Sequence, residues 1–192
     1  QKIPGRVTAE LLQEMVPNWV LGLEGNRFMR WGDGDLRFPR PIRWLVTLLD
    51  SELLPVTLEN GSEVCVSDRT TFGHRVLHPD TITLSAATGY VSALKKAYVT
   101  VDPAERKDTI LSQVAKVADS VNGHAVVNEG LLAEVVDLVE WPTTIIGKFD
   151  DEFLQRPSEV TITEMESHQR YFPVRPTADS TDLLPYFITV SN

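Results

Sequence analysis

Two histidines four residues apart, His74 and His78 in the stretch GHRVLHP, have the spacing at which imidazoles on one helical face bind zinc. A glycine and a proline bracket the stretch and disfavour a helix, and no glutamate follows the first histidine as it would in a zinc protease. We therefore expect no metal site here. The stretch predicts a loop in which His74 and Arg75 form hydrogen bonds with backbone groups or neighbouring carboxylates.

The stretch MESHQRYFPV, at residues 165–174, places donors, acceptors and aromatic rings side by side. A helix over 159–169 would put His168 one turn after a glutamate, close enough for an ion pair, and at a helix end that favours positive charge. Catalysis would need a second positioned partner, and the sequence identifies none. We therefore predict a helix-to-strand junction with Tyr171 and Phe172 packed, and with His168 or Gln169 hydrogen-bonded inside the domain.

No other motif indicates a catalytic centre. The stretch WGDGD at 31–35 is faintly similar to a calcium loop but lacks the further ligands of that motif, so it predicts a turn. No glycine-rich phosphate loop joins a strand to a helix, and Cys65 has the context of a strand residue and not of an activated thiolate. We assign no catalytic residue, no metal ligand and no cofactor to this chain. The residues of a candidate pocket or structural polar cluster are His74, Arg75, Glu140, His168 and Gln169.

The charge of the chain is uneven along its length. The formal net charge of −9 opposes binding to phosphates, yet residues 1–43 contain seven basic and five acidic residues, so the remainder carries −11. If any part contacts a nucleic-acid backbone, we expect it to be residues 27–43, called the arginine segment below. Arg43 has a second interpretation, as the partner of a buried carboxylate. The candidate nucleic-acid-binding residues of this segment are Arg27, Arg30, Arg37, Arg40 and Arg43.

The bulk composition is that of an ordinary globular protein, with 42% hydrophobic and 23% charged residues. No apolar run approaches the roughly 20 residues that a membrane-spanning helix needs. We therefore expect a soluble, cytoplasmic protein without membrane contact. A single cysteine, which has no partner for an internal disulfide, is consistent with a reducing compartment.

Two parts are expected along the chain. Residues 1–30 read as a lead-in segment with a short helix from Thr8 to about Val16, ended by a proline. Residues 31–192 predict a single α+β domain. Within it, the continuously apolar stretch 42–49 predicts a central strand of a covered sheet, and the following Asp-Ser turn predicts a β-hairpin.

The second half of the sequence has clear helix signals. Asp102 before a proline predicts a capped helix with one apolar face, and Asn128 or Glu129 predicts the start of another. HAVV, TTIIGKF and YFITVS predict strands. Because the hairpin signals exclude a wholly parallel sheet, the predicted fold class is α+β, with a mixed or antiparallel sheet and helices packed on it.

Three longer stretches resemble a known family, in the same order and with similar separations. They are MRWGDGDLRFPRPIRWLVTLLD, TTFGHRVLHP and LVEWPTTIIGKFDDEFLQRPSEVTITEMESHQRYFPV. Three unusual short motifs occur together within them, namely Arg40-Pro41-Ile42-Arg43-Trp44, Glu140-Trp141-Pro142 and His168-Gln169-x-Tyr171-Phe172. The sequence thereby resembles the β subunit of bacterial-type, heterotetrameric glycyl-tRNA synthetase, over essentially its whole length.

The resemblance implies more than the residues show. In that family, two α subunits activate glycine with ATP and Mg²⁺, while two long β subunits handle tRNA. The chain would then be an internal piece of a β subunit, with the α subunit, tRNA(Gly) and the rest of the β subunit as partners. The resemblance also implies an α+β fold similar to the editing-type domain of the phenylalanyl-tRNA synthetase β subunit.

Two functions follow from the resemblance. The first is a non-catalytic tRNA-handling or architectural domain that supports ATP-dependent charging of tRNA with glycine, so that the chain is part of a ligase without being catalytic itself. The alternative is an editing-type hydrolase that deacylates mischarged tRNA. Because a site that admits only glycine already excludes larger side chains, a second hydrolytic sieve has little to do.

Overall fold

The computed structural model describes residues 5–192. The chain divides into two compact units, Gln1–Ala97 and Tyr98–Asn192. The division falls near the middle of the chain, at a different place from the boundary at residue 30 that the sequence led us to expect. Its physical basis is the separation of the buried side chains, since the apolar core cluster of the second unit contains no residue before Ile110.

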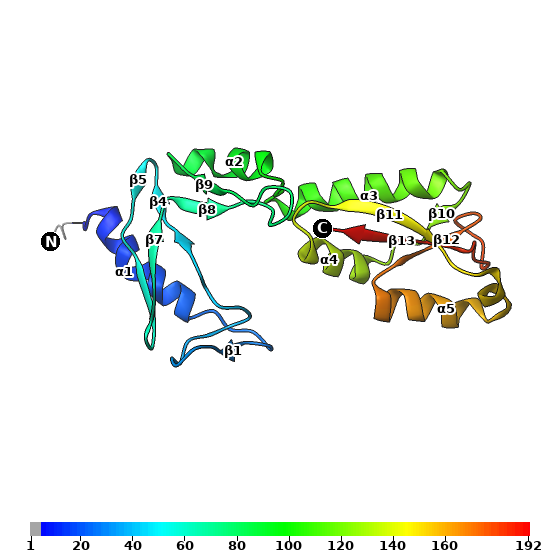
Figure 1. Cartoon of the computed structure of the whole chain (residues 1–192), viewed down its shortest axis with the longest axis horizontal. Coiled ribbons are helices and arrows are strands. Elements are labelled where there is room, and N and C mark those ends of the chain that lie inside the picture. Colours follow the sequence, from blue (N-terminus) through cyan, green and yellow to red (C-terminus); the bar gives the residue numbers. More distant parts are fainter. Residues whose placement is uncertain (1–4) are drawn as a thin grey trace. The chain divides into compact units, whose positions relative to one another are not determined.

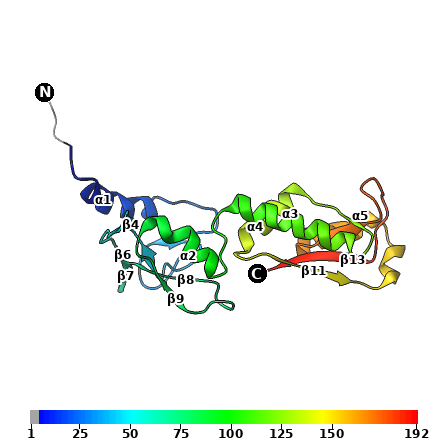
Figure 2. The same cartoon turned by 90° about the horizontal axis from the view of Figure 1, so that it is seen from above.

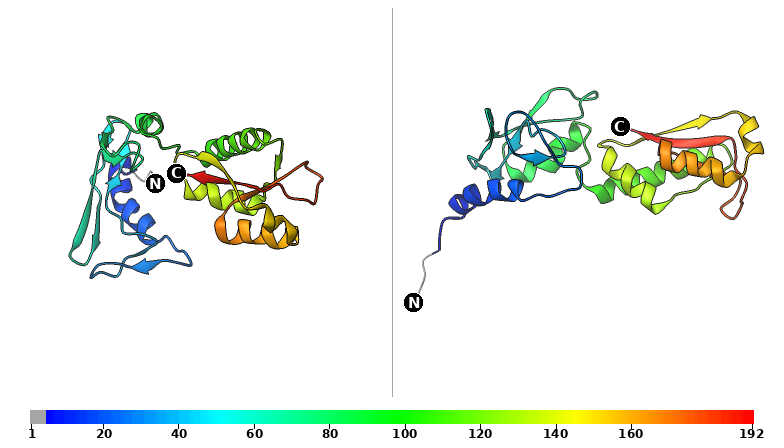
Figure 3. Two further views of the ribbon diagram at one scale, coloured as in Figure 1. Left: turned by 45° about the vertical axis from the view of Figure 1, so that its right-hand side comes forward. Right: turned by 90° about the horizontal axis from the view of Figure 1, so that it is seen from below.

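The first unit consists of short strands and two α-helices (Figure 1). Within the described residues its strands form four small sheets, β1-β2, β3-β7-β6, β4-β5 and β8-β9, and not one continuous layer (Figure 3). Its elements are α1 (Thr8–Leu21), β1 (Met29–Arg30), β2 (Arg37–Phe38), β3 (Leu45–Val46), β4 (Leu48–Leu49), β5 (Glu52–Leu53), β6 (Thr57–Asn60), β7 (Glu63–Asp68), β8 (Thr70–Phe72), β9 (Thr81–Thr83), η1 (Ala87–Gly89) and α2 (Tyr90–Lys96).

Helix α1 is longer than the sequence predicted, because it continues past Pro17 to Leu21. A proline removes one backbone hydrogen bond from a helix without necessarily ending it. The next residue supports the turn, since the Asn18 side-chain amide donates to the carbonyl of Glu14 at 2.9 Å. The helix ends at Gly22, and none of its residues is buried.

The apolar stretch 42–49 does not form the predicted central strand. It gives the two-residue strands β3 and β4, and β3 lies at the edge of its sheet, where it pairs in parallel with β7. No residue in this stretch is buried, and Trp44 is exposed. The predicted hairpin is confirmed, because β4 pairs with β5 in antiparallel register around Asp50, which has a φ of 52°.

The second unit has one antiparallel sheet in the order β10-β12-β13-β11. Helix α3 packs on this sheet and on α4, and Figure 2 shows both helices on the same side of β11 and β13. Its elements are α3 (Pro103–Asp119), β10 (His124–Ala125), α4 (Glu129–Leu138), β11 (Thr143–Lys148), η2 (Asp151–Gln155), α5 (Ser158–Glu164), the π-helical turn η3 (Met165–Gln169), β12 (Phe172–Arg175) and β13 (Tyr186–Ser191).

The predicted helix starts in this unit are confirmed. The Asp102 carboxylate accepts a hydrogen bond from the backbone N–H of Ala104 at 2.8 Å, and the Asn128 side chain accepts one from Gly130 at 2.9 Å. These caps satisfy backbone donors that have no partner within the helix. The predicted mixture of helices with mixed and antiparallel sheets is confirmed for the chain. No helix within residues 5–192 is long and apolar enough to span a membrane.

Candidate nucleic-acid interface in the first unit

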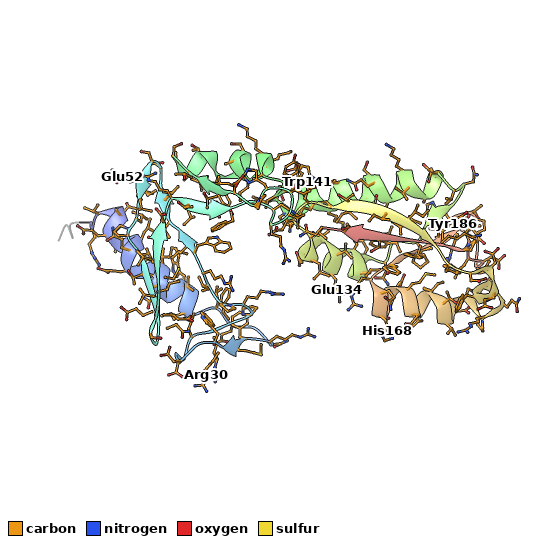
Figure 4. All side chains as sticks on the ribbon, in the orientation of Figure 1. Arg30, Glu52, Glu134, Trp141, His168 and Tyr186 are labelled. Carbon is orange, nitrogen blue, oxygen red and sulfur yellow. The ribbon has the colours of Figure 1, made fainter. Side chains whose placement is uncertain are left out.

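The arginine segment lies on the surface of the first unit, and all five of its arginines are exposed. Strands β1 and β2 form a hairpin within it, and Arg30, which Figure 4 labels, is paired with Arg37 in the register of the two strands. Directly opposed residues of an antiparallel pair project from the same face, so two cationic side chains share one face of this hairpin. Like charges in such positions are unfavourable unless an anion lies between or beside them.

The arginines differ in their partners. Arg30 forms an exposed ion pair with Asp35 at 2.8 Å. Within residues 5–192, by contrast, no hydrogen bond or ion pair engages the other four guanidinium groups. These four exposed side chains are Arg27, Arg37, Arg40 and Arg43. The second interpretation of Arg43, as the partner of a buried carboxylate, therefore finds no support in the structure.

The turn WGDGD fixes the arginine segment to the turn between β6 and β7. The Asp33 carboxylate accepts hydrogen bonds from the Ser62 backbone N–H at 2.9 Å and from the Ser62 hydroxyl at 3.0 Å. These bonds, the backbone one first, hold the pKa of the Asp33 carboxyl below its usual value. Trp31 adds a hydrogen bond from its indole N–H to the Glu63 carboxylate at 3.0 Å.

Asn60 provides the buried part of the same attachment. Its side-chain oxygen accepts from the backbone N–H of Leu36 at 2.9 Å, and its amide nitrogen donates to the carbonyl of Trp31 at 2.9 Å. Gly34 permits this approach, because a Cβ there would lie 2.0 Å from the Asn60 side-chain oxygen. Gly61 is required as well, since it has a φ of +65° and packs against Asp33.

The other end of the arginine segment is fixed to the same two strands. Beyond Arg43, Leu45 pairs with Ser67 and Val46 with Asp68 as β3 runs parallel to β7. The residues between the WGDGD turn and β3 are therefore held at both ends by the β6–β7 hairpin, once at its turn and once at the far end of β7. This gives three of the four unpaired guanidinium groups, those of Arg37, Arg40 and Arg43, a defined backbone, whereas Arg27 precedes the turn.

An aromatic cavity missed by the sequence analysis lies just beyond the arginine segment. It has a volume of about 390 Å³, and its walls are Trp44, Leu45, Val46, Leu48, Thr71, Leu84, Ala87 and Tyr90. The sequence pattern predicted a buried strand at Trp44, because the run that follows it is continuously apolar. The sequence feature that could have indicated this cavity is the tryptophan that directly follows Arg43, at the end of an exposed segment.

His74 and Arg75 have different surroundings in the first unit. His74 is buried, with 2% of its surface exposed, and its Nδ1 accepts hydrogen bonds from the backbone N–H groups of Val76 and Leu77 at 3.2 and 3.1 Å. This geometry places the proton of the neutral ring on Nε2, which has no partner among the described residues. Arg75 is exposed. His74 thus stabilises a tight turn through backbone donors, as predicted for a loop, whereas Arg75 forms no hydrogen bond or ion pair within residues 5–192.

Glu140 belongs to the second unit, and its backbone makes the contacts seen there. Its N–H donates to the Asn192 side chain at 2.6 Å, and its carbonyl accepts from the N–H of Thr100 at 2.9 Å. The Glu140 side chain is exposed. The neighbouring Trp141 packs edge-to-face with Tyr98, with ring centroids 5.4 Å apart.

The HQRYF stretch forms the predicted helix-to-strand junction, with an added π-helical turn. Phe172 is fully buried and Tyr171 stacks on Phe187 at 4.4 Å between centroids, as predicted. The prediction that His168 or Gln169 lies hydrogen-bonded inside the domain is wrong, because both are exposed. The wider π turn carries the chain around to a left-handed residue before β12, and leaves these side chains outside.

The remaining contacts of this junction are on the surface. The Nε2 atom of His168 lies 3.9 Å from the Glu164 carboxylate, and Figure 4 shows His168 pointing away from the strands. Gln169 lines a largely apolar cavity of about 360 Å³ together with Phe153 and Tyr171. His74, Arg75, Glu140 and His168 line none of the five cavities described for residues 5–192.

The five residues of the candidate polar cluster are therefore divided between the two units, with His74 and Arg75 in the first. Within residues 5–192, no three His, Cys, Asp or Glu side chains are grouped so that they could hold a metal ion. The Cys65 thiol is partly buried, and burial raises its pKa, which opposes a role as a reactive thiolate. The arginine segment and the adjoining aromatic cavity remain as the candidate functional surface.

Comparison with known sequences places the chain among the aminoacyl-tRNA synthetases. More particularly, it belongs to the family described as glycyl-tRNA synthetase beta subunit, whose model matches residues 1–192. Curated relatives named glycine–tRNA ligase beta subunit are 57% identical in Trichodesmium erythraeum, 53% in Gloeothece citriformis and 42% in Syntrophus aciditrophicus. These matches cover 99–100% of this chain but only 27% of each relative, so the chain spans about a quarter of their length.

Proposed function

We propose that this chain is a non-catalytic, tRNA-handling part of the β subunit of a glycine–tRNA ligase, and that its first unit contacts the tRNA backbone. One observation carries the proposal. Four exposed guanidinium groups lie within 17 residues and have no partner among residues 5–192, although the chain as a whole is acidic. Exposed cations grouped without counter-charges are the footprint of a phosphate-binding surface.

The opposed pair Arg30 and Arg37 supports the same function. Two guanidinium groups on one face of a two-stranded hairpin repel each other in the free protein. Asp35 relieves part of this repulsion through its ion pair with Arg30. A phosphate between the two arginines removes the rest, because guanidinium groups donate bidentate, charge-assisted hydrogen bonds to phosphate oxygens.

The wider setting is part of this proposal. The relatives are named as β subunits, which supports assembly with an α subunit; ATP and Mg²⁺ then act at the α subunit, and tRNA(Gly) is the shared substrate. A cytoplasmic location belongs to the same assignment. We further propose a fold similar to the editing-type domain of the phenylalanyl-tRNA synthetase β subunit, on the basis of the mixed α/β architecture.

The alternative function, hydrolysis of mischarged tRNA, has less support. It requires an acid, a base and a water site around one cavity. His74 is occupied by backbone donors, while Arg75, Glu140 and His168 are exposed and line none of the described cavities. Among the described residues, no hydrogen bond or ion pair joins any two of these side chains.

The test is tRNA binding by the assembled enzyme with the four unpaired arginines replaced by alanine. Each phosphate contact that is lost reduces the slope of log affinity against log salt by about 0.7–0.9. We expect weaker binding and a slope shallower by roughly 3 units if all four arginines contact phosphates. Filter binding of tRNA(Gly) between low and moderate salt measures both quantities.

The matched control removes four exposed basic residues outside the arginine segment, namely Arg75, Lys96, Lys116 and Arg156. Both variants change the net charge by the same amount, so the comparison tests the position of the removed charges and not their number. A fourfold arginine variant with the affinity and salt slope of the control would remove the tRNA-binding role from the segment.

A further inference from the structure

Three aromatic side chains of the first unit are partly exposed to solvent, two of them in the wall of one cavity and the third packed on one of these two. Trp44, Phe72 and Tyr90 are 48%, 40% and 39% exposed, although large aromatic rings contribute most to stability when they are buried. The rings of Trp44 and Phe72 pack at 4.7 Å between centroids with an interplanar angle of 55°. Tyr90, the first residue of α2, lines the same cavity as Trp44.

The walls of this cavity carry no ionised group. They consist of the two aromatic residues Trp44 and Tyr90, aliphatic side chains and Thr71. Each of the other four cavities described for residues 5–192 has a carboxylate in its wall, such as Glu63, Asp35, Asp119 or Glu164. The aromatic cavity can therefore receive a flat, uncharged group attached to a negatively charged chain, without repulsion from its own lining.

We propose that Trp44, Phe72 and Tyr90 form a stacking platform for an unpaired nucleobase of RNA, with Arg40 and Arg43 holding the adjoining phosphates. Aromatic rings next to cationic side chains are the usual surface on which proteins bind single-stranded nucleic acid, because every base has a face that can stack. A paired base inside a helix does not offer this face. The platform therefore selects unpaired nucleotides, and it rests on the tRNA-binding function proposed above.

The position of the arginines fits this ligand. Arg43 immediately precedes Trp44, and Arg40 precedes it by four residues, so an extended chain places their Cα atoms within about 14 Å of one another at most. Both guanidinium groups are exposed and have no partner within residues 5–192. Arg43 itself lines the neighbouring cavity, together with Glu59 and Glu63. A single strand that stacks a base on Trp44 must therefore extend to that cavity for one of its phosphates to meet Arg43.

The apolar cavity of the second unit is a poorer site for the same ligand. It is rich in aromatic carbon, with Phe149, Phe153 and Phe187 in its wall, but Glu164 lines it as well. The second unit also has seven basic and 16 acidic residues, so its field repels phosphates. Charge thus favours the first unit as the place where a nucleotide stacks.

The experiment compares single-stranded and duplex RNA of about 12 nucleotides, a length within the usual site size, as ligands of the assembled enzyme. Replacing Trp44 and Phe72 together by alanine should weaken single-strand binding about tenfold and leave duplex binding unchanged. Trp44→Tyr keeps a ring at the same place and should retain most of the affinity. Tyr90→Leu, which preserves bulk without aromaticity, should give a smaller loss than the double variant.

The matched control is Trp19→Ala, which removes another exposed tryptophan of the same unit. Thermal unfolding of each variant establishes that the first unit is intact; if the double alanine variant unfolds, Trp44→Leu and Tyr90→Leu give the measurement instead. A single-strand affinity that is unchanged, or that falls equally for duplex RNA or equally in Trp19→Ala, overturns the platform.

The outcomes also separate this inference from the function on which it rests. If the fourfold arginine variant weakens tRNA binding while the aromatic variants bind single strands normally, the platform fails and the proposed function stands. If neither the arginine variant nor the aromatic variants weaken RNA binding, both the proposed function and the stacking platform fail. If the aromatic variants weaken only the association with the partner subunit, the surface is a protein interface and the platform is excluded.

Discussion

The interiors of the two units are stabilised by different kinds of side chain. The second has an apolar core in which Ile110 of α3, Leu132 of α4, Phe172 of β12 and Ile188 of β13 are completely buried. The first buries fewer apolar side chains and includes four buried polar ones, namely Asn60, Ser67, Thr71 and His74. A unit held by such directed bonds can leave many of its apolar and cationic side chains on the surface.

Ser67 shows how the polar interior of the first unit works. Its hydroxyl donates to the carbonyl of Leu54 at 2.7 Å and accepts from the backbone N–H of Val56 at 2.9 Å. Buried polar groups stabilise a fold only when their hydrogen bonds are satisfied, as those of the Ser67 hydroxyl are. The first unit therefore depends on individual hydrogen bonds, whereas the second depends on packed volume.

Charge follows the same division. The first unit has 11 basic and 11 acidic residues and is neutral overall, so the whole net charge of −9 belongs to the second. In the second unit, the cations Lys107, Lys148 and Arg170 form ion pairs with carboxylates. In the arginine segment, four of the five cations have no such partner among the described residues. The comparison indicates one unit suited to stability and another suited to binding.

The largest effect is expected from breaking the apolar core of the second unit. Phe172→Ala should lower the free energy of unfolding of that unit by about 3–5 kcal/mol, because a large buried side chain is replaced by a cavity. Urea unfolding of the chain measures the loss. Leu138→Ala, on the exposed face of α4, is the control and should change stability by less than about 0.5 kcal/mol. Equal losses of unfolding free energy in the two variants would show that the apolar core does not stabilise this unit.

A smaller effect is expected from the polar interior of the first unit. Asn60→Ala leaves the N–H of Leu36 and the carbonyl of Trp31 without their side-chain partner, which should cost about 1–3 kcal/mol. Because the same bonds fix the arginine segment, tRNA affinity should fall as well. Asn26→Ala, at an exposed position of the same unit, is the control. A variant that is less stable but has normal tRNA affinity would show that the Asn60 hydrogen bonds to the arginine segment are not needed for tRNA binding.

The third prediction concerns the single paired arginine of the segment. Asp35→Asn removes the partner of Arg30 and should raise tRNA affinity up to about fivefold at low salt, since an exposed ion pair is worth at most about 1 kcal/mol. Glu52→Gln removes an exposed negative charge elsewhere in the first unit and controls for net charge. A rise of the same size in both variants would mean that Arg30 does not contact tRNA.

The smallest effect is a dependence of stability on pH. The pKa of Asp33 is lowered in the folded state by its bonds to Ser62, so the ionised form stabilises the fold above the unfolded pKa of about 4. This contribution is lost as the pH falls through the lower, folded value. The urea midpoint of the chain should therefore exceed that of Asp33→Asn at neutral pH, and the difference should shrink below about pH 4. A constant difference across this range would exclude the titration of Asp33 as its cause.

Sequence reasoning succeeded where structure is determined locally. The helix caps at Asp102 and Asn128 involve residues only two or three positions apart, and the spacing of apolar residues along α3 and α4 is read directly from the chain. The hairpin around Asp50 is local in the same sense. These features need no knowledge of distant contacts.

It failed where distant contacts decide the outcome. The apolar stretch 42–49 has the pattern of a buried strand, but its exposure depends on the edge position of β3 next to β7, some 20 residues further on. The attachment of WGDGD to Asn60 and Ser62 likewise joins segments 24 to 29 residues apart. The π-helical turn has no sequence signature, so the exposure of His168 and Gln169 could not be foreseen. The arginine segment was identified from charge alone, and its role stays a prediction.

The two attachments of the arginine segment, at the WGDGD turn and at β3, have a thermodynamic consequence. Between the WGDGD turn and β3 the backbone is tethered twice to one hairpin, so much of its freedom is already lost before any ligand arrives. Binding to such a preorganised segment costs little further conformational entropy. More of the interaction free energy therefore appears as affinity. Removing one of these attachments should therefore weaken binding of the ligand chiefly by raising the conformational entropy lost on binding, while the contacts between the arginines and the ligand are preserved.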